Sequence, residues 1–309
     1  METPTVLSLD GQIVPWEQGT VHVTSAAFKY GASVFEGLRG YWNQADQQLY
    51  VFRAPEHLHR LEYSQRFHRF DTIYDAATVS SHMVDLLRAM DCRSNVHIVT
   101  TAYLKGGANP GVTGPVGLAI TAVERAAPDW VKNGVSAQVS SWMRVPDQAM
   151  PMRVKTTANY NNGRLAALQA TADGYDAPLM LNARGKLSEG PGMCFIMIRD
   201  GKAVMPSITN DILESITRET IIKILREDMS IEVIERDIDR SELVAAEEAF
   251  FCGTAWEVTP ITSIDRLTIG NGQPGPLTRQ LQKHYFGICD GSIAKHAEWR
   301  LPIHDHRAR

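Results

Sequence analysis

Two hydrophobic periodicities alternate along the 309-residue chain and predict where its strands and helices lie. Short apolar runs closed by turn-forming residues predict strands, whereas apolar positions three and four apart predict helices. In the first part of the chain, the Asp10-Gly11 turn between two short runs predicts a hairpin. The expected strands are 6–9, 12–15, 21–23, 31–41, 48–52, 96–104 and 116–123, and the expected helices are 54–70 and 79–90.

A polar run from 124 to 134 separates this part from a second alternation of strands and helices. Strands are expected at 136–142, 177–181, 194–198, 203–205, 231–235, 249–252 and 258–264, and helices at 164–172, 212–227, 240–246 and 277–286. We therefore expect a small α+β domain at 1–125, an interdomain linker at 126–134 and a large domain at 135–309. No period of about 20 to 50 residues recurs, which argues against solenoids and propellers.

Composition and charge narrow the class of protein. Apolar residues make up 44% and charged residues 21% of the chain, and the net charge is −4, so we expect a globular protein that binds neither nucleic acid nor an anionic membrane. The cysteines lie far apart and predict free thiols in a reducing compartment. The N-terminus lacks a signal-peptide pattern and no apolar run approaches the ~18 residues of a membrane span, which predicts a cytoplasmic protein. No metal site is predicted.

Lys155 is the candidate nucleophile of the chain. It lies between Val154 and two threonines, and it precedes a turn-forming cluster at 159–163 that opens an Ala/Leu-rich helix. A lysine that is desolvated or near other cations loses its proton readily, and the free amine can attack a carbonyl to form a Schiff base. A solvated or salt-bridged lysine is the ordinary alternative.

Six blocks of sequence, at 21–41, 51–61, 140–160, 185–196, 212–222 and 251–261, resemble landmarks of one family in that family's order. They include VFEGLRGY, HLHRL, VKTTANY, SEGPG and GTAWE. The family is the branched-chain amino-acid aminotransferases, which are fold-type IV enzymes that use pyridoxal 5'-phosphate (PLP). The resemblance implies two α/β domains, the larger one barrel-like, with the cofactor between them. It also implies amino-group transfer between a hydrophobic, branched-chain amino acid and 2-oxoglutarate.

The resemblance assigns three residues to the reactive part of the cofactor. Lys155 would form the internal aldimine and later move a proton between the substrate carbon and the cofactor. Glu189 would pair with the pyridine nitrogen and keep it protonated. Tyr160 would meet the phenolic oxygen. Without the family, Glu189 is an ordinary turn residue and Tyr160 an ordinary core tyrosine.

The phosphate of the cofactor is assigned to residues of three separate segments. Arg60 matches the family's phosphate-binding arginine, and Arg53 is the alternative. Ile216 and Thr217 begin a helix whose N–H groups could hold a phosphate, and Thr254 adds a hydroxyl. The segment reads LESIT, whereas the family has a glycine in place of Ser215.

The resemblance also implies a substrate pocket and a homodimer or higher homo-oligomer. Tyr30 and the loop at 107–109 would reach the pocket of the neighbouring subunit. The residues assigned to substrate are Tyr30, Phe35, Gly37, Arg39, Ala255 and Trp256.

Two departures bear on the substrate. Bacterial members carry an arginine on the strand that here spans 96–104, yet the stretch from 94 to 107 holds none, and Arg39, His97 and Lys105 are the nearest candidates for the substrate carboxylate. Trp256 replaces a small residue and would narrow the pocket or stack on an aromatic substrate.

These departures keep other functions open. A fold-type IV transaminase for D-amino acids or (R)-amines is one. An aminodeoxychorismate-type PLP lyase also stays open, because that family shares the lysine and the glutamate. A non-catalytic homologue that binds a metabolite or partner would tolerate Lys155→Ala, but it has no need of Lys155, Glu189, Arg60 and Tyr160 together.

Overall fold

The computed structural model describes residues 4–107 and 109–305, so residue 108 of the loop at 107–109 lies outside the described residues. The chain forms two compact units, and each is described by itself. Unit 1 comprises Met1–Ala126, Val154–Ala158 and Gly287–Arg309, and unit 2 comprises Ala127–Arg153 and Asn159–Phe286. Lys155 therefore belongs to unit 1 although the residues on either side of its short segment belong to unit 2. The domain limits expected from sequence, with a linker at 126–134, stay a prediction.

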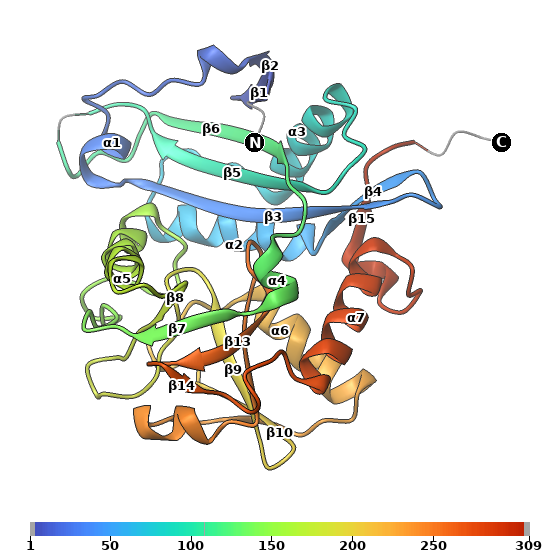
Figure 1. The fold of residues 1–309 in the computed structure, drawn as a ribbon. Coiled ribbons are helices and arrows are strands. Elements are labelled where there is room, and N and C mark those ends of the chain that lie inside the picture. The colour runs from blue at the N-terminus through green and yellow to red at the C-terminus, as the bar shows by residue number, and fades with distance from the viewer. Residues whose placement is uncertain (1–3, 108, 306–309) are drawn as a thin grey trace. The chain divides into compact units, whose positions relative to one another are not determined.

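Unit 1 is built on a seven-stranded sheet (Figure 1). Its order is β15 (Arg300–Pro302), β4 (Gln48–Phe52), β3 (Ser33–Asn43), β5 (Val96–Leu104), β6 (Val116–Glu124), β1 (Val6–Leu9) and β2 (Gln12–Pro15). Neighbouring strands pair antiparallel throughout. The predicted hairpin of β1 and β2 is confirmed. A short 3₁₀ turn, η1 (Trp16–Gln18), follows it.

The strand predicted at 21–23 is wrong, because this stretch leads into helix α1 (Ala26–Tyr30) without pairing. Ser25 caps the helix by accepting a hydrogen bond from the Phe28 N–H, and Gly31 ends it with a φ of 64°. A capping serine and a left-handed glycine are strong local signals for a short helix. Here they override the strand preference of two valines.

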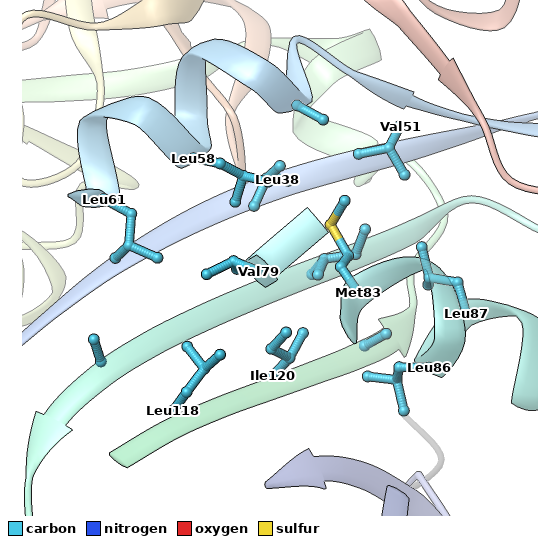
Figure 2. Close-up of a cluster of buried hydrophobic side chains, with 14 of the residues drawn as sticks. Leu38, Val51, Leu58, Leu61, Val79, Met83, Leu86, Leu87, Leu118 and Ile120 are labelled. Carbon is cyan, nitrogen blue, oxygen red and sulfur yellow. The ribbon is translucent and has the colours of Figure 1, made fainter. Parts of the chain in front are cut away.

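Helices α2 (Ala54–Phe67) and α3 (Ala76–Ala89) cover one face of this sheet. Figure 2 shows the buried side chains that they bring to it. Each large aliphatic side chain buried in this way contributes about 1.5–3 kcal/mol. The labelled members are Leu58 and Leu61 of α2, Val79, Met83, Leu86 and Leu87 of α3, and Leu38, Val51, Leu118 and Ile120 of the strands. Because side chains alternate along a strand, Phe35, Gly37 and Arg39 point to the opposite face.

Unit 2 contains an eight-stranded mixed sheet. Its order is β11 (Val233–Glu235), β10 (Lys202–Met205), β9 (Cys194–Arg199), β12 (Glu248–Gly253), β13 (Glu257–Ile264), β7 (Val135–Val139) and β8 (Ala177–Leu179), and β14 (Leu267–Thr268) pairs with β13. The pairs β10–β11, β13–β7 and β7–β8 are parallel, and the others are antiparallel. Strand β12 is buried along its whole length.

The remaining helices are α4 (Asp129–Asn133), α5 (Tyr160–Ala172), α6 (Ile216–Lys223) and α7 (Pro276–Asp290). Shorter turns are η2 (Thr157–Asn159), η3 (Ile224–Asp228), η4 (Arg240–Ala245) and η5 (Ala297–Trp299). The helix predicted at 212–227 begins only at Ile216, because Ser215 caps it, and it ends in a π turn at η3. The helix predicted at 240–246 is 3₁₀. Within residues 4–107 and 109–305, no helix has the length and apolar character needed to cross a membrane.

Candidate functional site

The segment that carries Lys155 runs beside the first residues of β3 in unit 1. The Phe35 N–H donates to the Lys155 carbonyl at 3.0 Å, and the Thr156 hydroxyl donates to the Ser33 carbonyl at 3.0 Å. The Ser33 and Thr157 hydroxyls lie 2.7 Å apart. Three polar contacts over three residues fix the backbone of the lysine. Its side chain therefore starts from a defined position.

Gly31 allows this close approach. Its φ of 64° is accessible to glycine at little cost, and a Cβ built on it would lie 3.2 Å from the Cβ of Ala158. Any larger residue would press on the end of the lysine segment. Both the backbone conformation at position 31 and the nearby Ala158 therefore favour a glycine there.

The Lys155 amine extends over one face of the sheet of unit 1. Its Nζ lies 5.0 Å from the centre of the Phe35 ring. Gly37 and Arg39 follow Phe35 on this face at every second residue, and the Arg39 guanidinium lies 5.8 Å from the centre of the Tyr41 ring. The structure therefore brings four of the predicted residues, Lys155, Phe35, Gly37 and Arg39, to one sheet face.

Arg60 of α2 belongs to a largely buried cluster around Glu36, on the α2 side of β3. Burial and, to a smaller extent, Arg60 and Lys155 lower the pKa of its member His57, so the Lys155 charge also acts on this side of the sheet. Arg60 Nε donates to Glu36 Oε1 at 2.6 Å and its Nη2 donates to Glu36 Oε2 at 2.8 Å. His57 Nδ1 lies 2.7 Å from the same Oε2. Burial raises the pKa of Glu36, but Arg60 and His57 outweigh burial and bring this pKa down to about 2. Arg60 is thus held in one orientation by a fixed negative charge.

Arg53, the alternative phosphate ligand, is engaged elsewhere in unit 1. Its Nε donates to Glu56 at 2.7 Å, and its guanidinium lies 5.0 Å from the centre of the Trp299 ring. Its backbone has a φ of 52° and forms the N-cap of α2. These contacts give Arg53 a structural role at the start of the helix.

In unit 2, Glu189 is buried and bound by an arginine that the sequence analysis missed. Arg144 Nη2 donates to Glu189 Oε1 at 2.5 Å, and the Leu213 N–H donates to the same oxygen at 3.1 Å. The Cys194 thiol lies 3.6 Å from Oε2. Arg144 Nε also donates to the Asp211 carbonyl at 3.3 Å. These contacts hold the Glu189 carboxylate in one orientation inside unit 2.

The same segment leads from Asp211 into α6, where Ile216 and Thr217 begin the helix. Ser215 stands in the place of the family's glycine, with a φ of −77°, and its hydroxyl accepts from the Arg218 N–H. No left-handed conformation is needed at this position, so the serine closes the helix end without strain. The first N–H groups of a helix lack intrahelical partners and favour anions.

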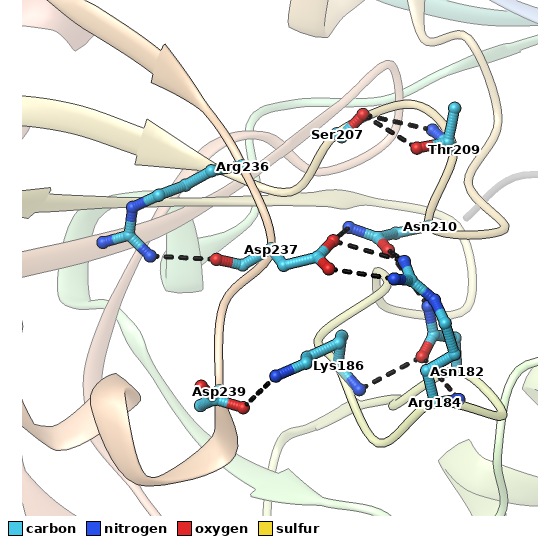
Figure 3. Close-up of polar contacts among 9 residues, drawn as sticks. All are labelled: Asn182, Arg184, Lys186, Ser207, Thr209, Asn210, Arg236, Asp237 and Asp239. Carbon is cyan, nitrogen blue, oxygen red and sulfur yellow. Dashed lines mark hydrogen bonds and ion pairs between the residues drawn. The ribbon is translucent and has the colours of Figure 1, made fainter.

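A polar network holds the segment that precedes α6 (Figure 3). Asn182 Nδ2 donates to Asn210 Oδ1 at 3.0 Å, and Asn210 Nδ2 donates to Asp237 Oδ1 at 2.9 Å. Arg184 Nη1 donates to Asp237 Oδ2 at 2.9 Å. Asn182 and Asn210 are both buried. Three loops are thereby tied together beside the residues that contact Glu189.

Tyr160, Thr254 and the loop after Glu189 converge in unit 2. Tyr160 is the first residue of α5, and a Cβ on Gly192 would lie 3.8 Å from its Cε1. A Cβ on Gly253, at the end of β12, would lie 3.0 Å from the Gly192 carbonyl oxygen. Thr254 directly follows this glycine. The small residues let these backbones approach each other closely.

Trp256 forms an aromatic cluster with two residues of unit 2. Its ring centre lies 5.6 Å from that of Trp130 and 5.7 Å from that of Phe251. Trp130 comes from α4, within the stretch expected to be a linker. The indole is therefore packed against protein side chains, a contact that periodicity alone could not reveal.

Two further predicted residues lie at the surface of unit 1. Tyr30, at the end of α1, is exposed together with Val21, Val23 and Phe28. Lys105, a candidate for the substrate carboxylate, forms an ion pair with Asp10. The Asp10 carboxylate therefore already neutralises the charge of Lys105.

Comparisons with known proteins identify the family of the chain. A family model described as amino-transferase class IV matches residues 33–264. A probable branched-chain-amino-acid aminotransferase of Aquifex aeolicus (strain VF5) is 38% identical over 300 residues, which are 96% of this chain and 96% of that protein.

Solved structures are similar over nearly the whole chain. A branched-chain amino acid aminotransferase from Thermobaculum terrenum in PLP-form has a TM-score of 0.92 and 40% identity, with 99% of this chain and 100% of that chain covered. A T.th. branched-chain amino acid aminotransferase complexed with N-(5'-phosphopyridoxyl)-L-glutamate has a TM-score of 0.91 and 31% identity, with 98% and 100% covered. The resemblance and the mixed α/β, fold-type IV class predicted from sequence are confirmed.

Proposed function

This chain belongs to the class IV aminotransferases, among the branched-chain amino-acid aminotransferases, and we propose that it moves an amino group between a hydrophobic amino acid and 2-oxoglutarate. Two observations, one in each unit, support the proposal: a positioned amine in unit 1 and a buried, hydrogen-bonded carboxylate in unit 2. Lys155 is held by backbone contacts over the Phe35 ring, and Glu189 is buried against Arg144.

The residues present fit pyridoxal phosphate. The chain offers an amine for its aldehyde, a buried carboxylate for its ring nitrogen, and the start of α6 with Thr217 for its phosphate. When bound, this cofactor supplies an aldehyde that exchanges amines and a ring that accepts the electron pair of a broken C–H bond. The T. terrenum relative is in PLP-form.

We assign the protein's own roles as follows. Lys155 Nζ would hold the cofactor through its aldehyde, and as a free amine Nζ would move the proton at the substrate α-carbon. Glu189 would pair with the pyridine nitrogen, and Arg144 holds Glu189 in orientation. Tyr160 donates to the phenolic oxygen of the cofactor.

The phosphate and substrate assignments follow the same reasoning. Arg60, with its orientation fixed by Glu36, is proposed as the phosphate-binding arginine, together with Ile216, Thr217 and Thr254. Tyr30, Phe35, Gly37, Arg39, Ala255 and Trp256 are proposed to line the substrate pocket. The glutamate adduct bound by the T.th. relative supports glutamate and 2-oxoglutarate as the second substrate pair.

The test uses the absorption spectrum of the purified protein with PLP. We expect an absorption band of the lysine-bound cofactor that converts to that of the pyridoxamine form on addition of L-leucine and returns on addition of 2-oxoglutarate. Borohydride reduction followed by peptide mass analysis should mark Lys155. Lys155→Ala should lose the band, whereas Lys186→Ala, a control whose amine pairs with Asp239 at 2.6 Å, should keep it. No band in the wild-type protein would rule out the enzyme.

A second candidate is a transaminase for D-amino acids or (R)-amines. It is favoured by the absence of an arginine on β5. Conversion of the band by D-alanine or (R)-1-phenylethylamine, and not by L-leucine, would move the assignment to this activity.

We further propose that the protein acts as a homodimer in the cytoplasm. Val21, Val23, Phe28 and Tyr30 expose apolar surface within one short stretch, and surfaces of this kind commonly mediate association. Val21 and Phe28 also line a cavity of about 320 Å³ in unit 1, with Leu7, Trp16 and Tyr103. The buried cysteines Cys92, Cys194, Cys252 and Cys289 are free thiols, the state that a reducing compartment maintains.

A further inference from the structure

His97 occupies the sheet face of unit 1 that carries Lys155, Phe35 and Arg39. It lies on β5 directly opposite Arg39 of β3, and residues opposite each other in an antiparallel pair project to the same side. A Cβ on Gly37 would lie 3.4 Å from His97 Cε1, so the imidazole ring extends across the glycine. A larger residue at position 37 would push the ring away.

The ring has hydrogen-bonding capacity that the described part of the chain does not use. His97 Nδ1 is buried and has no hydrogen-bond partner among residues 4–107 and 109–305. Leaving a buried polar atom without a partner costs about 1–3 kcal/mol, so such an atom calls for an explanation. The ring is well placed to bind something outside the chain.

The charges around His97 identify the kind of ligand. Burial, followed by Arg125, Arg39 and Lys155, lowers the pKa of His97 to about 4, so three cations surround a neutral ring. On this face, β3, β5 and β6 present no Asp or Glu, because Glu36 and Glu124 project to the other side. A neutral imidazole can donate one N–H, and the cations around it favour an anion.

We propose that His97, with Arg39 beside it, forms the subsite that receives the carboxylate of the amino-acid and oxo-acid substrates. The inference rests on the proposed transaminase function and names the group that replaces the missing strand arginine. The imidazole N–H donates to one carboxylate oxygen, and the Arg39 guanidinium supplies the opposite charge. Lys105, the other candidate, is already paired with Asp10.

The test measures by calorimetry how tightly the PLP-loaded protein binds two ligands that have the same carbon skeleton. 4-Methylpentanoate carries the carboxylate, and 4-methylpentan-1-ol replaces it with a neutral hydroxyl. Loss of a hydrogen bond to a charged group should make His97→Ala bind the carboxylate about 10- to 100-fold more weakly. The alcohol should bind equally well to both proteins. His97→Gln, which keeps an N–H donor, should recover part of the difference.

His68→Ala is the matched control. His68 is also a partly buried histidine of unit 1 whose Nε2 has no partner in the described structure, but aromatic rings surround it. This variant should bind both ligands as the wild type does. Equal loss of both ligands in His97→Ala, or no loss of either, would overturn the inference. If His97→Ala does not fold, the binding of the two ligands is compared between His97→Gln and the wild type instead.

Failure of the proposed function is distinguishable from failure of this subsite. A wild-type protein that shows no conversion with L-leucine would contradict the proposed function, and the two-ligand comparison would still report whether His97 selects a carboxylate. A wild-type protein that turns over leucine while His97→Ala binds 4-methylpentanoate normally would contradict the subsite alone.

Discussion

Two buried carboxylates, Glu36 in unit 1 and Glu189 in unit 2, are each held by an arginine. Removing a charge from water is costly, and a buried ion pair is tolerated only when its hydrogen bonds are made. The sequence pointed to Glu189 through the motif that surrounds it. It could not point to Glu36, because its partners His57 and Arg60 lie 21 and 24 residues away.

Glu36→Gln should lower the free energy of unfolding by about 3–5 kcal/mol, because the fully buried Glu36 side chain would no longer neutralise the Arg60 guanidinium, whose side chain is only 12% exposed. Urea denaturation measures this effect. Glu56→Gln is the control, since Glu56 is half-exposed and its ion pair with Arg53 spans only one helical turn; it should cost at most about 1 kcal/mol. Equal effects of the two substitutions would refute the importance of the buried pair.

The depressed pKa of His97 predicts a pH dependence of stability. Burial, Arg125, Arg39 and Lys155 lower the pKa from 6.5 to about 4, so the unfolded chain binds a proton at a higher pH than the folded chain does. Between these values the unfolded state holds more protons, and stability falls as the pH falls. His97→Gln should lose less stability than the wild type between about pH 6.5 and 4, as measured by urea unfolding at several pH values. Parallel curves for the two proteins would show that His97 does not contribute.

At the scale of elements, the segment Val154–Ala158, which carries Lys155, packs against Gly31 at the end of α1. Gly31 has a positive φ, as does Gly201 in the turn between β9 and β10, but only Gly31 faces a neighbour. A substitution at Gly201 therefore tests backbone strain alone, whereas one at Gly31 tests backbone strain together with crowding against Ala158.

Gly201→Ala should cost about 1 kcal/mol, which is the penalty for a left-handed alanine. Gly31→Ala should cost more, because the new methyl group would lie 3.2 Å from the Ala158 Cβ and displace the lysine segment. Only the second change should also slow the borohydride labelling of Lys155. Thermal unfolding and peptide mass analysis measure the two effects, and labelling that is equally slow in both variants would contradict this account.

The sequence predicted most elements, and both ends of β1, β2, β4 and β5 agree with the prediction. Strand β5 has the predicted limits of 96–104, because alternating apolar residues are closed by turn formers on both sides. Serine caps set the start of α1 and the start of α6 at Ile216. A cap depends on one or two residues, so the hydrophobic pattern of the surrounding stretch does not reveal it. No sequence pattern indicated Arg144, because its role depends on a contact with Glu189, which lies 45 residues away in another loop.

At the scale of the whole molecule, the surface of unit 1 exposes apolar residues where a solvated protein would normally keep polar ones. Phe28 is 69% exposed and Val23 is 64% exposed, and both lie within the stretch from 21 to 30. Large exposed aromatic residues contribute strongly when they are buried at an interface. The proposed homodimer would bury them.

Phe28→Asp should therefore weaken self-association about 30-fold or more, since it removes an aromatic anchor and adds a charge. Sedimentation velocity over a range of protein concentrations measures the change. Leu267→Asp, at a residue of unit 2 that is 55% exposed, should leave association unchanged. A wild-type protein that sediments as a monomer would contradict the dimer itself.

The assignment of Val154–Ala158 to unit 1 has a consequence for protein engineering. If the gene is cut after residue 126, the shorter polypeptide retains Ser33 and Phe35, whereas the longer one carries Lys155 and Thr156, which bind to them. The reactive amine regains its setting only when both polypeptides are made together. The chain is therefore suited to a two-piece complementation assay, in which cofactor labelling of the lysine reports that the two halves have met.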